Sequence, residues 1–376
     1  MKKLITLVVT YFISCYMVQS QSNYFYSKAV WKDNTNIPIN AHGGGILFDK
    51  GTYYWYGEYK SENTTTALKG VSCYSSTDLY HWRNRGIALQ VSSNPKSDIA
   101  KGCILERPKV IYNSTTKKFV MWFHLELHDK GYASARAGVA VSSSPEGPFT
   151  YIESKRVNAG IYPENMPAED RNYSFLTEQK KEWWTPEWYT AIRRGMFVKR
   201  DFKEGQMSRD MTLFVDDNGK AYHIYSSEDN LTLQIAELSD DYLTHSGKYF
   251  RIAPGGHNEA PAIMKYNGTY WMITSGCTGW EPNAARLFSA HDIWGPWKQY
   301  DNPCQGTNKE KTFGGQSTFL LPVEGLKNAY IFMADEWRPN HPIDSRYIWL
   351  PVLFKNNIPY LAWMLKWNLD VFIKKN

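Results

Sequence analysis

The sequence predicts an all-β protein, a five-bladed β-propeller with an insertion around residues 155–205. Three observations support this fold class. Phe, Trp and Tyr make up 15% of the 376 residues, and aromatic side chains favour strands. A short pattern, a turn followed by an alternating aromatic and aliphatic strand, recurs along the chain. Outside residues 155–205 we find almost no long amphipathic helix.

Residues 1–20 are expected to be a signal peptide rather than part of the fold. Two lysines precede the apolar run LITLVVTYFIS, and small residues follow it, which is the layout of a secretory signal. The run is too short to span a bilayer. We predict cleavage after Ser20 and a secreted or periplasmic protein, with a lipid anchor at Cys15 as the alternative. Residues 22–376 then form a single domain.

Five hairpins are predicted along the chain. In each, a short apolar stretch is followed by a turn of the Asn-Gly or Asp-Lys-Gly type and then by an alternating strand, which is the signature of a β-hairpin. The second strands lie at 51–58, 117–124, 219–227, 268–276 and 328–335. Further turn-and-strand segments lie at 75–86, 142–152, 236–249 and 289–300. Repeated sheets of this kind predict the blades of a propeller.

The segment around 155–205 interrupts this pattern. It is polar, rich in Trp and punctuated by Pro, so we expect a partly helical insertion between the second and third blades. It would form either a wall of the functional site or a surface decoration. The end of the chain, residues 347–369, is typical of strands that close the propeller by pairing with the N-terminal segment.

The charge of the chain argues against some partners. Its formal net charge is +6 without a basic block, which argues against a nucleic-acid-binding protein. No apolar run after residue 20 is long enough for a membrane helix. Cys73, Cys103, Cys277 and Cys304 form no CxxC pair, so we expect mostly buried thiols, with one disulfide as an alternative. We expect a monomer whose partner is an oligo- or polysaccharide.

Two further motifs are set aside. His42 to Gly45 match the oxyanion-hole motif of lipases and esterases, but that motif needs a G-x-S-x-G turn, and GGQSTF lacks the final glycine. The stretch HLELH places His124, Glu126 and His128 on one strand face. These side chains could bind a metal, but a polar strand end is the favoured interpretation, and no metal site is predicted.

The residues that precede each hairpin are the candidates for chemistry. In a propeller the innermost strand of each blade lines the central channel, and the loops that lead into those strands gather at one end of it. These positions hold, in blade order, His42, Glu106, Asp210, Glu259 and Gln316. Clustered carboxylates suit glycoside hydrolysis, because neighbouring negative charge keeps one acid protonated for donation to the leaving oxygen.

In these stretches the chain resembles glycoside hydrolase family 43. The resemblance rests on NAHGGGILFDKGTYYWYGE, ERPKVIYN, RDMTLFVDDNGKAYHIYSSE, HNEAPAI, SGCTGWEPNAAR, FGGQST and DSRYIWLP. The branch it is most similar to contains exo-β-1,3-galactanases and β-galactofuranosidases. It implies a secreted, exo-acting, inverting hydrolase that releases terminal galactose from β-1,3-galactan or arabinogalactan-type glycans. The alternatives are a β-D-galactofuranosidase or α-L-arabinofuranosidase with the same site, and a propeller that only binds glycan.

The same resemblance implies catalytic roles. Glu259 would be the general acid, and Asp210 would orient it and tune its pKa. The aspartate base usual in the first blade is missing, because the stretch around His42 takes its place. Gln316 is the favoured residue for handling the attacking water. Glu106 is the other candidate, although in this branch the equivalent acid is more similar to a ligand of a substrate hydroxyl.

Weaker signals indicate substrate contacts. Trp280 could stack on a sugar face or simply pack within the propeller. The full set of candidate contacts is His42, Glu58, His257, Thr278, Trp280, Asn283, Asp335 and Arg346. No organic cofactor is implied. Many relatives hold a structural cation in the channel, but Gln316 stands where they carry a metal-linked histidine, so a cation is not favoured.

Overall fold

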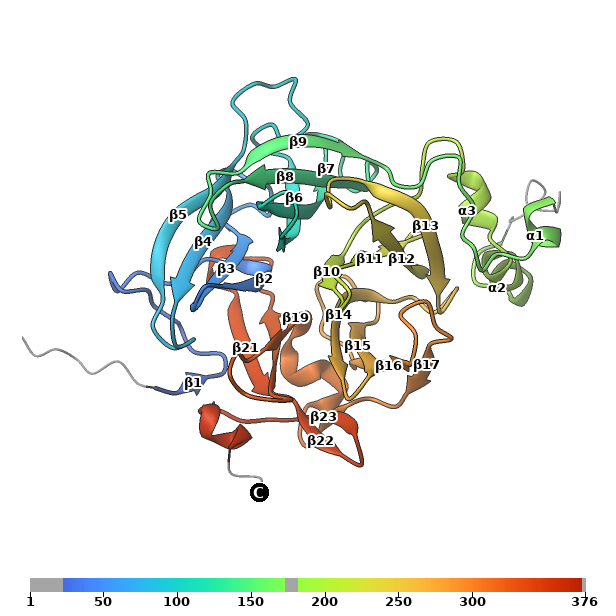
Figure 1. Ribbon diagram of the computed structural model, residues 1–376. Helices are drawn as coiled ribbons and strands as arrows, with labels where there is room; N and C mark the ends of the chain where they lie inside the picture. Colours follow the sequence, from blue (N-terminus) through green and yellow to red (C-terminus); the bar gives the residue numbers. More distant parts are fainter. Residues whose placement is uncertain (1–22, 173–181, 374–376) are drawn as a thin grey trace, which may run out of the picture.

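The sheets of the computed structural model are arranged around a common centre, as in a β-propeller (Figure 1). The structure describes residues 23–172 and 182–373. The predicted signal peptide at 1–20 and the alternative anchor at Cys15 lie outside these residues. Within the described ranges, no helix has the length and apolar character needed to cross a membrane.

Four sheets contain four antiparallel strands each, paired in chain order. The first consists of β2 (His42–Asp49), β3 (Thr52–Glu58), β4 (Gly70–Ser76) and β5 (Arg83–Gln90). The second consists of β6 (Ile104–Asn113), β7 (Lys118–Glu126), β8 (Arg136–Ser142) and β9 (Thr150–Lys155). The third consists of β10 (Met211–Val215), β11 (Ala221–Ser227), β12 (Thr232–Leu238) and β13 (His245–Ile252). The fourth consists of β14 (Glu259–Tyr266), β15 (Thr269–Ser275), β16 (Arg286–Ala290) and β17 (Lys298–Tyr300).

A fifth sheet has three strands, β19 (Gln316–Pro322), β20 (Tyr330–Glu336) and β21 (Arg346–Pro351). The innermost strands β2, β6, β10, β14 and β19 contact one another in this cyclic order, so the ring is closed. Each predicted hairpin is confirmed as the innermost pair of one of these sheets.

The described residues form six sheets of three or more strands, whereas five blades were predicted. The sixth such sheet is made of β18 (Cys304–Gln305), β22 (Leu353–Lys355) and β23 (Ile358–Ala362). Its strand β23 contacts β21. Its strands are short, so the alternation that revealed the hairpins is not visible in them.

The ends of the chain close the ring. Strand β1 (Phe25–Tyr26) pairs with β24 (Lys366–Trp367), and Phe25 lies opposite Trp367. This confirms the predicted pairing of the two terminal segments.

The hydrophobic core lies between neighbouring sheets, where Tyr56 of β3 belongs to the same buried cluster as Phe123 of β7. Within residues 23–172 and 182–373, the short 3-10 helices are η2 (Lys309–Gly314), η3 (Pro342–Asp344) and η4 (Leu369–Phe372).

The insertion runs between β9 and β10, as predicted, and is partly helical. It contains α1 (Ala168–Asn172), α2 (Pro186–Arg193) and α3 (Met196–Arg200). Figure 1 shows these helices at the rim, beyond β13. The hydroxyl of Thr185 accepts a hydrogen bond from the amide of Trp188 and so caps the N-terminus of α2.

A β-bulge lies near the start of four innermost strands, β2, β6, β14 and β19. In three of them a residue in the bulge has a left-handed backbone, with φ of 61° at Gly43, 56° at Arg107 and 53° at Ala260. A bulge re-aims the side chains beside it. The bulges therefore turn the first residues of these strands toward the channel.

The four cysteines of the described part are all free thiols, and Cys73, Cys103 and Cys304 are buried. The expectation of mostly buried thiols is confirmed. No disulfide joins any of them.

Candidate active site

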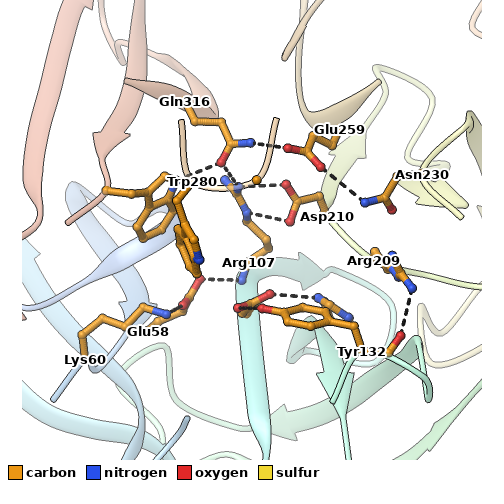
Figure 2. Close-up of a pocket in the computed structure, with 14 residues that line it drawn as sticks. Glu58, Lys60, Arg107, Tyr132, Arg209, Asp210, Asn230, Glu259, Trp280 and Gln316 are labelled. Carbon is orange, nitrogen blue, oxygen red and sulfur yellow. Dashed lines mark hydrogen bonds and ion pairs between the residues drawn. The ribbon is translucent and has the colours of Figure 1, made fainter. Parts of the chain in front are cut away.

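A cavity of about 200 Å³ opens where the innermost strands begin (Figure 2). Half of the predicted site residues line it, namely Glu58, Glu106, Asp210, Trp280, Glu259 and Gln316. The sequence-based reasoning named His124 only as a possible metal ligand. It missed the other lining residues, which are Lys60, Arg107, Tyr132, Arg209, Asn230, Gly279 and Trp337. The hairpin-start positions of four different sheets thus converge, as expected.

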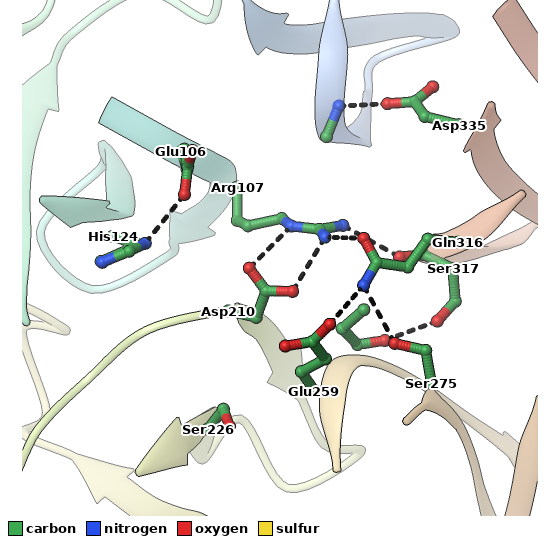
Figure 3. A network of polar contacts seen from close by, with 12 residues as sticks. Glu106, Arg107, His124, Asp210, Ser226, Glu259, Ser275, Gln316, Ser317 and Asp335 are labelled. Carbon is green, nitrogen blue, oxygen red and sulfur yellow. Dashed lines mark hydrogen bonds and ion pairs between the residues drawn. The ribbon is translucent and has the colours of Figure 1, made fainter. Parts of the chain in front are cut away.

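Arg107 connects the sides of this cavity (Figure 3). Its Nε and Nη2 donate to the two carboxylate oxygens of Asp210 at 3.1 and 2.8 Å. Its Nη1 donates to the backbone carbonyl of Ser317 at 3.0 Å, and Nη2 also donates to Oε1 of Gln316 at 2.5 Å. A bidentate pair between guanidinium and carboxylate fixes both groups in orientation. Arg107 of the second sheet therefore holds Asp210, at the start of the third sheet, and Gln316, at the start of the fifth, in place.

Every hydrogen-bonding position of the Gln316 amide is occupied. Its oxygen accepts from Arg107 and from the indole Nε1 of Trp337, the latter at 2.8 Å. Its nitrogen donates to Oε1 of Glu259 at 2.9 Å and to the hydroxyl of Ser275 at 3.0 Å. Arg and Trp side chains only donate, so the amide oxygen must face them and the nitrogen must face Glu259.

Glu259, the first residue of β14, is held in an environment that favours its neutral form. Burial and the nearby charge of Asp210 raise the pKa of Glu259 to about 8, although Arg107 and hydrogen bonds from Cys277 and Gln316 oppose this shift. Its Oε2 also accepts a hydrogen bond from Asn230 at 3.3 Å. A carboxyl group that stays protonated near neutral pH can donate a proton to a substrate.

Glu106 has the opposite electrostatic character. Burial opposes its ionisation, but hydrogen bonds from His124 and Tyr132 and the charges of His124 and Lys60 lower the pKa of Glu106 to about 2. Its Oε2 lies 3.2 Å from Nδ1 of His124, and its Oε1 accepts from the Tyr132 hydroxyl at 2.9 Å. Glu259 and Glu106 of the same cavity therefore differ in charge, because Glu259 favours the neutral form and Glu106 favours the ionised form.

Glu58 and Lys60 form a buried ion pair at the edge of the same cavity. Nζ of Lys60 lies 2.5 Å from Oε2 of Glu58. Oε1 of Glu58 accepts from the backbone amide of Arg107 at 3.0 Å. Glu58 thereby secures the bulge that places Arg107, and burial raises its pKa.

None of the residues of the His-Gly-Gly-Gly stretch lines the cavity. His42 is fully buried, stacks on Tyr347 and does not line the cavity. The amide of Gly43 donates to the carboxylate of Asp335, and the carbonyl of Gly43 accepts from Nζ of Lys109 at 2.9 Å. A side chain at Gly44 would collide with the carbonyl of Tyr56. Since these backbone groups are buried and bonded, the stretch packs the channel and forms no oxyanion hole.

The remaining predicted contacts lie outside the central cavity. Asp335 is buried against Gly43. Arg346 pairs with Asp344 at 2.6 Å and lines a different cavity on the first and fifth sheets. Thr278, Asn283 and His257 line a third cavity beside the insertion.

Two tryptophans flank the cavity. The ring of Trp280 is 40% exposed and meets Trp337 edge-on, with centroids 5.8 Å apart. The guanidinium of Arg107 lies over the Trp337 ring, with its central carbon Cζ 5.4 Å from the ring centroid. An exposed aromatic face beside paired polar groups is well suited to a sugar, which has both an apolar face and hydroxyl groups.

One group of residues in the described ranges has metal-ligating atoms close together. Atoms of Glu106, His124 and Asp210 lie within 4.8 Å of one another. However, both ring nitrogens of His124 contact carboxylates, Glu106 at 3.2 Å and Glu126 at 2.9 Å, and these contacts raise its pKa to about 9 despite burial. A protonated imidazole has no free lone pair for a metal. His128, the last residue of the HLELH stretch, lies beyond β7 and is exposed beside Asp129.

The described part of the insertion does not contribute to the central cavity. Trp184 and Tyr189 instead line the third cavity, together with His257 of the loop before β14. The described residues of the insertion therefore form no wall of the central cavity, but they border a neighbouring one.

The chain was compared with known protein families and curated proteins. A sequence profile described as Glycosyl hydrolases family 43 matches residues 161–325. A β-D-galactofuranosidase of Aspergillus niger is 26% identical over 121 residues, which are 31% of this chain and 35% of that protein. The chain thus matches about a third of the length of this curated relative.

Solved structures give longer matches. A family 43 β-1,3-galactosidase solved with galactodeoxynojirimycin is 63% identical, with a TM-score of 0.90, and the match covers 92% of this chain and all of that one. An exo-β-1,3-galactanase of Phanerochaete chrysosporium solved with β-1,3-galactotriose is 32% identical, with a TM-score of 0.74 and coverage of 93% and 69%. An exo-β-1,3-galactanase of Clostridium thermocellum is 34% identical, with a TM-score of 0.74 and coverage of 92% and 66%.

Proposed function

The chain belongs to family 43 of the glycosyl hydrolases, and on that premise we propose that it is an exo-acting, inverting enzyme that releases terminal galactose from β-1,3-linked galactan. The enzyme is a glycoside hydrolase. The observation that supports the proposal most is the pair of carboxyl groups with opposed protonation, Glu259 and Glu106, in one small cavity.

Glu259 is the general acid of the proposed reaction. The acid must be protonated when the glycosidic bond breaks, so that the leaving oxygen departs as a hydroxyl. Burial and the charge of Asp210 supply that condition by raising the pKa of Glu259 to about 8. Both oxygens of Asp210 accept hydrogen bonds from Arg107, which holds the charged carboxylate beside the acid. Asp210 tunes the acid, as its position in the family implies.

Glu106 activates the water in this proposal, in place of the initially favoured Gln316. An inverting enzyme holds acid and base roughly 6.5–9.5 Å apart, with the sugar and a water between them. The Gln316 nitrogen lies 2.9 Å from Glu259, which is too close for that arrangement. Its amide positions are also all bonded to protein groups. Gln316 therefore positions the acid, and the ionised Glu106 is left to accept a proton from water.

The size of the cavity supports exo action. A volume of about 200 Å³ lies below the range of roughly 300–1,000 Å³ that holds drug-sized ligands. One sugar ring fits such a space better than the middle of a polysaccharide. Galactose is the favoured sugar because the solved relatives with high coverage are described as acting on β-1,3-linked galactose. The match to a β-D-galactofuranosidase makes β-galactofuranosides the second candidate substrate.

We also propose that the enzyme is exported and acts as a monomer. Export is supported by the signal-like layout of residues 1–20. A polymeric glycan is met outside the cytoplasm, so export would bring the enzyme to its substrate.

Product analysis tests the substrate proposal. The enzyme is incubated separately with β-1,3-galactan, an arabinogalactan, a synthetic β-galactofuranoside and an α-L-arabinofuranoside, and the released monosaccharides are separated by chromatography. The proposal predicts free galactose from β-1,3-galactan, and a chain that shortens by one unit at a time. Release from the furanosides alone would support the second candidate, and binding without release would support a glycan-binding propeller.

A further inference from the structure

The third cavity lies between the insertion and the fourth sheet, beside the proposed active site. It is an open cavity of about 650 Å³, and the residues that matter here are Trp184, Tyr189, His257, Tyr300, Asp301 and Asn302. Cys277 and Thr278 line it as well, whereas the next residues of the same loop, Gly279 and Trp280, line the central cavity. One loop therefore separates the two cavities.

Helix α2 of the insertion forms one wall of this cavity and is held in place by hydrogen bonds from the third sheet. Arg251 donates to the carbonyls of Ile192 and Arg193 at the end of α2, both at 2.7 Å. Arg251 is itself paired with the buried Glu228 through two hydrogen bonds of 2.7 and 2.6 Å. An ion pair that also satisfies the last carbonyls of a helix fixes that helix on the sheet below. Tyr189 on α2 therefore keeps its place in the cavity.

Trp184 presents an aromatic surface to this cavity. Its ring stacks on His257, with centroids 5.1 Å apart and an interplanar angle of 26°. The residue is nevertheless 59% exposed. An indole braced on one side and open to solvent on the other offers a flat face on which a ligand can stack.

The chemistry of the lining fits a carbohydrate. The aromatic rings of Trp184, Tyr189 and Tyr300 supply flat apolar surfaces, and Asp301 and Asn302 supply carboxylate and amide groups. Pyranose rings carry a face of C–H groups and an edge of hydroxyls. Such a ligand satisfies aromatic and polar groups together, which neither a lipid nor a peptide of apolar side chains would do.

The position of the cavity indicates which part of the substrate reaches it. The thiol of Cys277 lines the cavity and hydrogen-bonds Glu259. His257, which braces Trp184, precedes Glu259 by two residues. The general acid must lie beside the leaving group, because it donates its proton to the leaving oxygen. The cavity is thus on the leaving-group side of the scissile bond.

We propose that this cavity, with Trp184 as its platform, binds the galactan chain beyond the scissile bond. The inference rests on the proposed function and adds a second contact for long substrates. An oligosaccharide that spans both cavities is held at two places, whereas a disaccharide reaches only the central one. Through Trp184 and Tyr189, the insertion between the second and third sheets therefore makes the enzyme prefer long galactan chains to short ones.

The test compares two neighbouring tryptophans. Trp184→Ala removes the platform, and Trp183→Ala is the matched control, because Trp183 is 52% exposed and does not line the cavity. The values of kcat/KM are measured on β-1,3-galactobiose and on a β-1,3-galactan oligosaccharide of defined, greater length. Melting temperatures of both variants check folding. We expect Trp184→Ala to lower kcat/KM about tenfold on the long substrate only, the loss typical of one aromatic contact.

The outcomes separate the two levels of the proposal. If Trp184→Ala behaves like Trp183→Ala on both substrates, the platform is wrong while the proposed function stands. If Trp184→Ala lowers both substrates equally, Trp184 acts through His257 on the acid, and the platform is wrong as well. If the unchanged enzyme releases galactose from neither substrate, the proposed function fails and the platform for galactan fails with it.

Discussion

The amide nitrogen of Gln316 lies 2.9 Å from Oε1 of Glu259, and the oxygen of the same amide accepts hydrogen bonds from Arg107 and Trp337. The donors on one side fix the amide orientation, and the orientation directs the nitrogen at the acid. Because Arg107 also holds both oxygens of Asp210, a single guanidinium aligns the residue that tunes the acid and the residue that positions it.

The pH dependence of the reaction follows from this alignment. Since Glu259 acts only when protonated and its pKa is about 8, kcat/KM should fall above about pH 8, tenfold for each further pH unit. Asp210→Asn removes a charge that raises this pKa and frees the positive charge of Arg107, so the decline should begin at lower pH. Asp216→Asn, which breaks an ion pair with Lys265 away from the cavity, is the control. An unchanged profile in Asp210→Asn would contradict the tuning role.

Loss of the acid should depend on the leaving group. Glu259→Gln keeps the shape of the side chain but cannot donate the proton, so kcat on β-1,3-galactobiose should fall by about 10²–10⁴. On an aryl galactoside with an acidic phenol as leaving group, the fall should be much smaller, because that phenol departs without protonation. Glu281→Gln, on the exposed loop beside the site, should match the unchanged enzyme. Equal losses on both substrates would argue against an acid role.

Azide separates the two candidates for handling the water. Glu106→Ala should lower kcat about a hundredfold or more, and azide should restore turnover by attacking the sugar in place of water, with α-galactosyl azide as the product. Gln316→Ala should also lower kcat, but azide should not restore it, because the acid and not the nucleophile is impaired. Both predictions are measured as initial rates with and without azide.

A control covers the indirect route through His124. Glu126 contacts the other nitrogen of His124 at 2.9 Å but does not line the cavity. If Glu126→Gln loses as much activity as Glu106→Ala and azide also restores its turnover, the loss in both variants comes from a disturbed His124 and not from a missing base. If azide restores turnover in Gln316→Ala but not in Glu106→Ala, Gln316 and not Glu106 activates the water.

The stability of the fold should fall in acid because two buried histidines, His42 and His223, and the partly buried His245 resist protonation. Burial lowers the pKa of His42 and of His245 to about 3, and that of His223 well below its usual range. The unfolded chain therefore takes up these protons first, so stability is full above about pH 6.5 and is lost toward about pH 3, by about 1.4 kcal/mol per pH unit and histidine. Urea unfolding at several pH values measures this loss. His245→Gln should make it shallower, and the exposed His128→Gln should not.

The sequence predicted most of the fold because its signals are local. Turn residues and alternating aromatic strands identified the five hairpins, and all five form. The sheet of β18, β22 and β23 was missed because strands of two to five residues carry too few alternations. The insertion was located by its composition, but its contact with the loop of His257 is a tertiary contact that no local pattern reports.

Six of the fourteen residues that line the cavity were predictable from local signals as well. Glu106, Asp210, Glu259 and Gln316 converge because they begin equivalent strands. Arg107 was missed because neighbouring residues of a regular strand point to opposite faces, and only the bulge with φ of 56° brings it into the cavity beside Glu106. His42 holds the equivalent first position but packs against Tyr347.

The stereochemistry of the first product tests the central claim most directly. Proton NMR recorded during the first turnovers on β-1,3-galactobiose distinguishes the anomers of the galactose that leaves the non-reducing end, before they interconvert. An acid and a water-activating base on opposite faces of the sugar displace the leaving group once, so we predict α-galactose as the first product. β-Galactose as the first product would mean retention, and would contradict the assignment of Glu259 and Glu106 as an inverting pair.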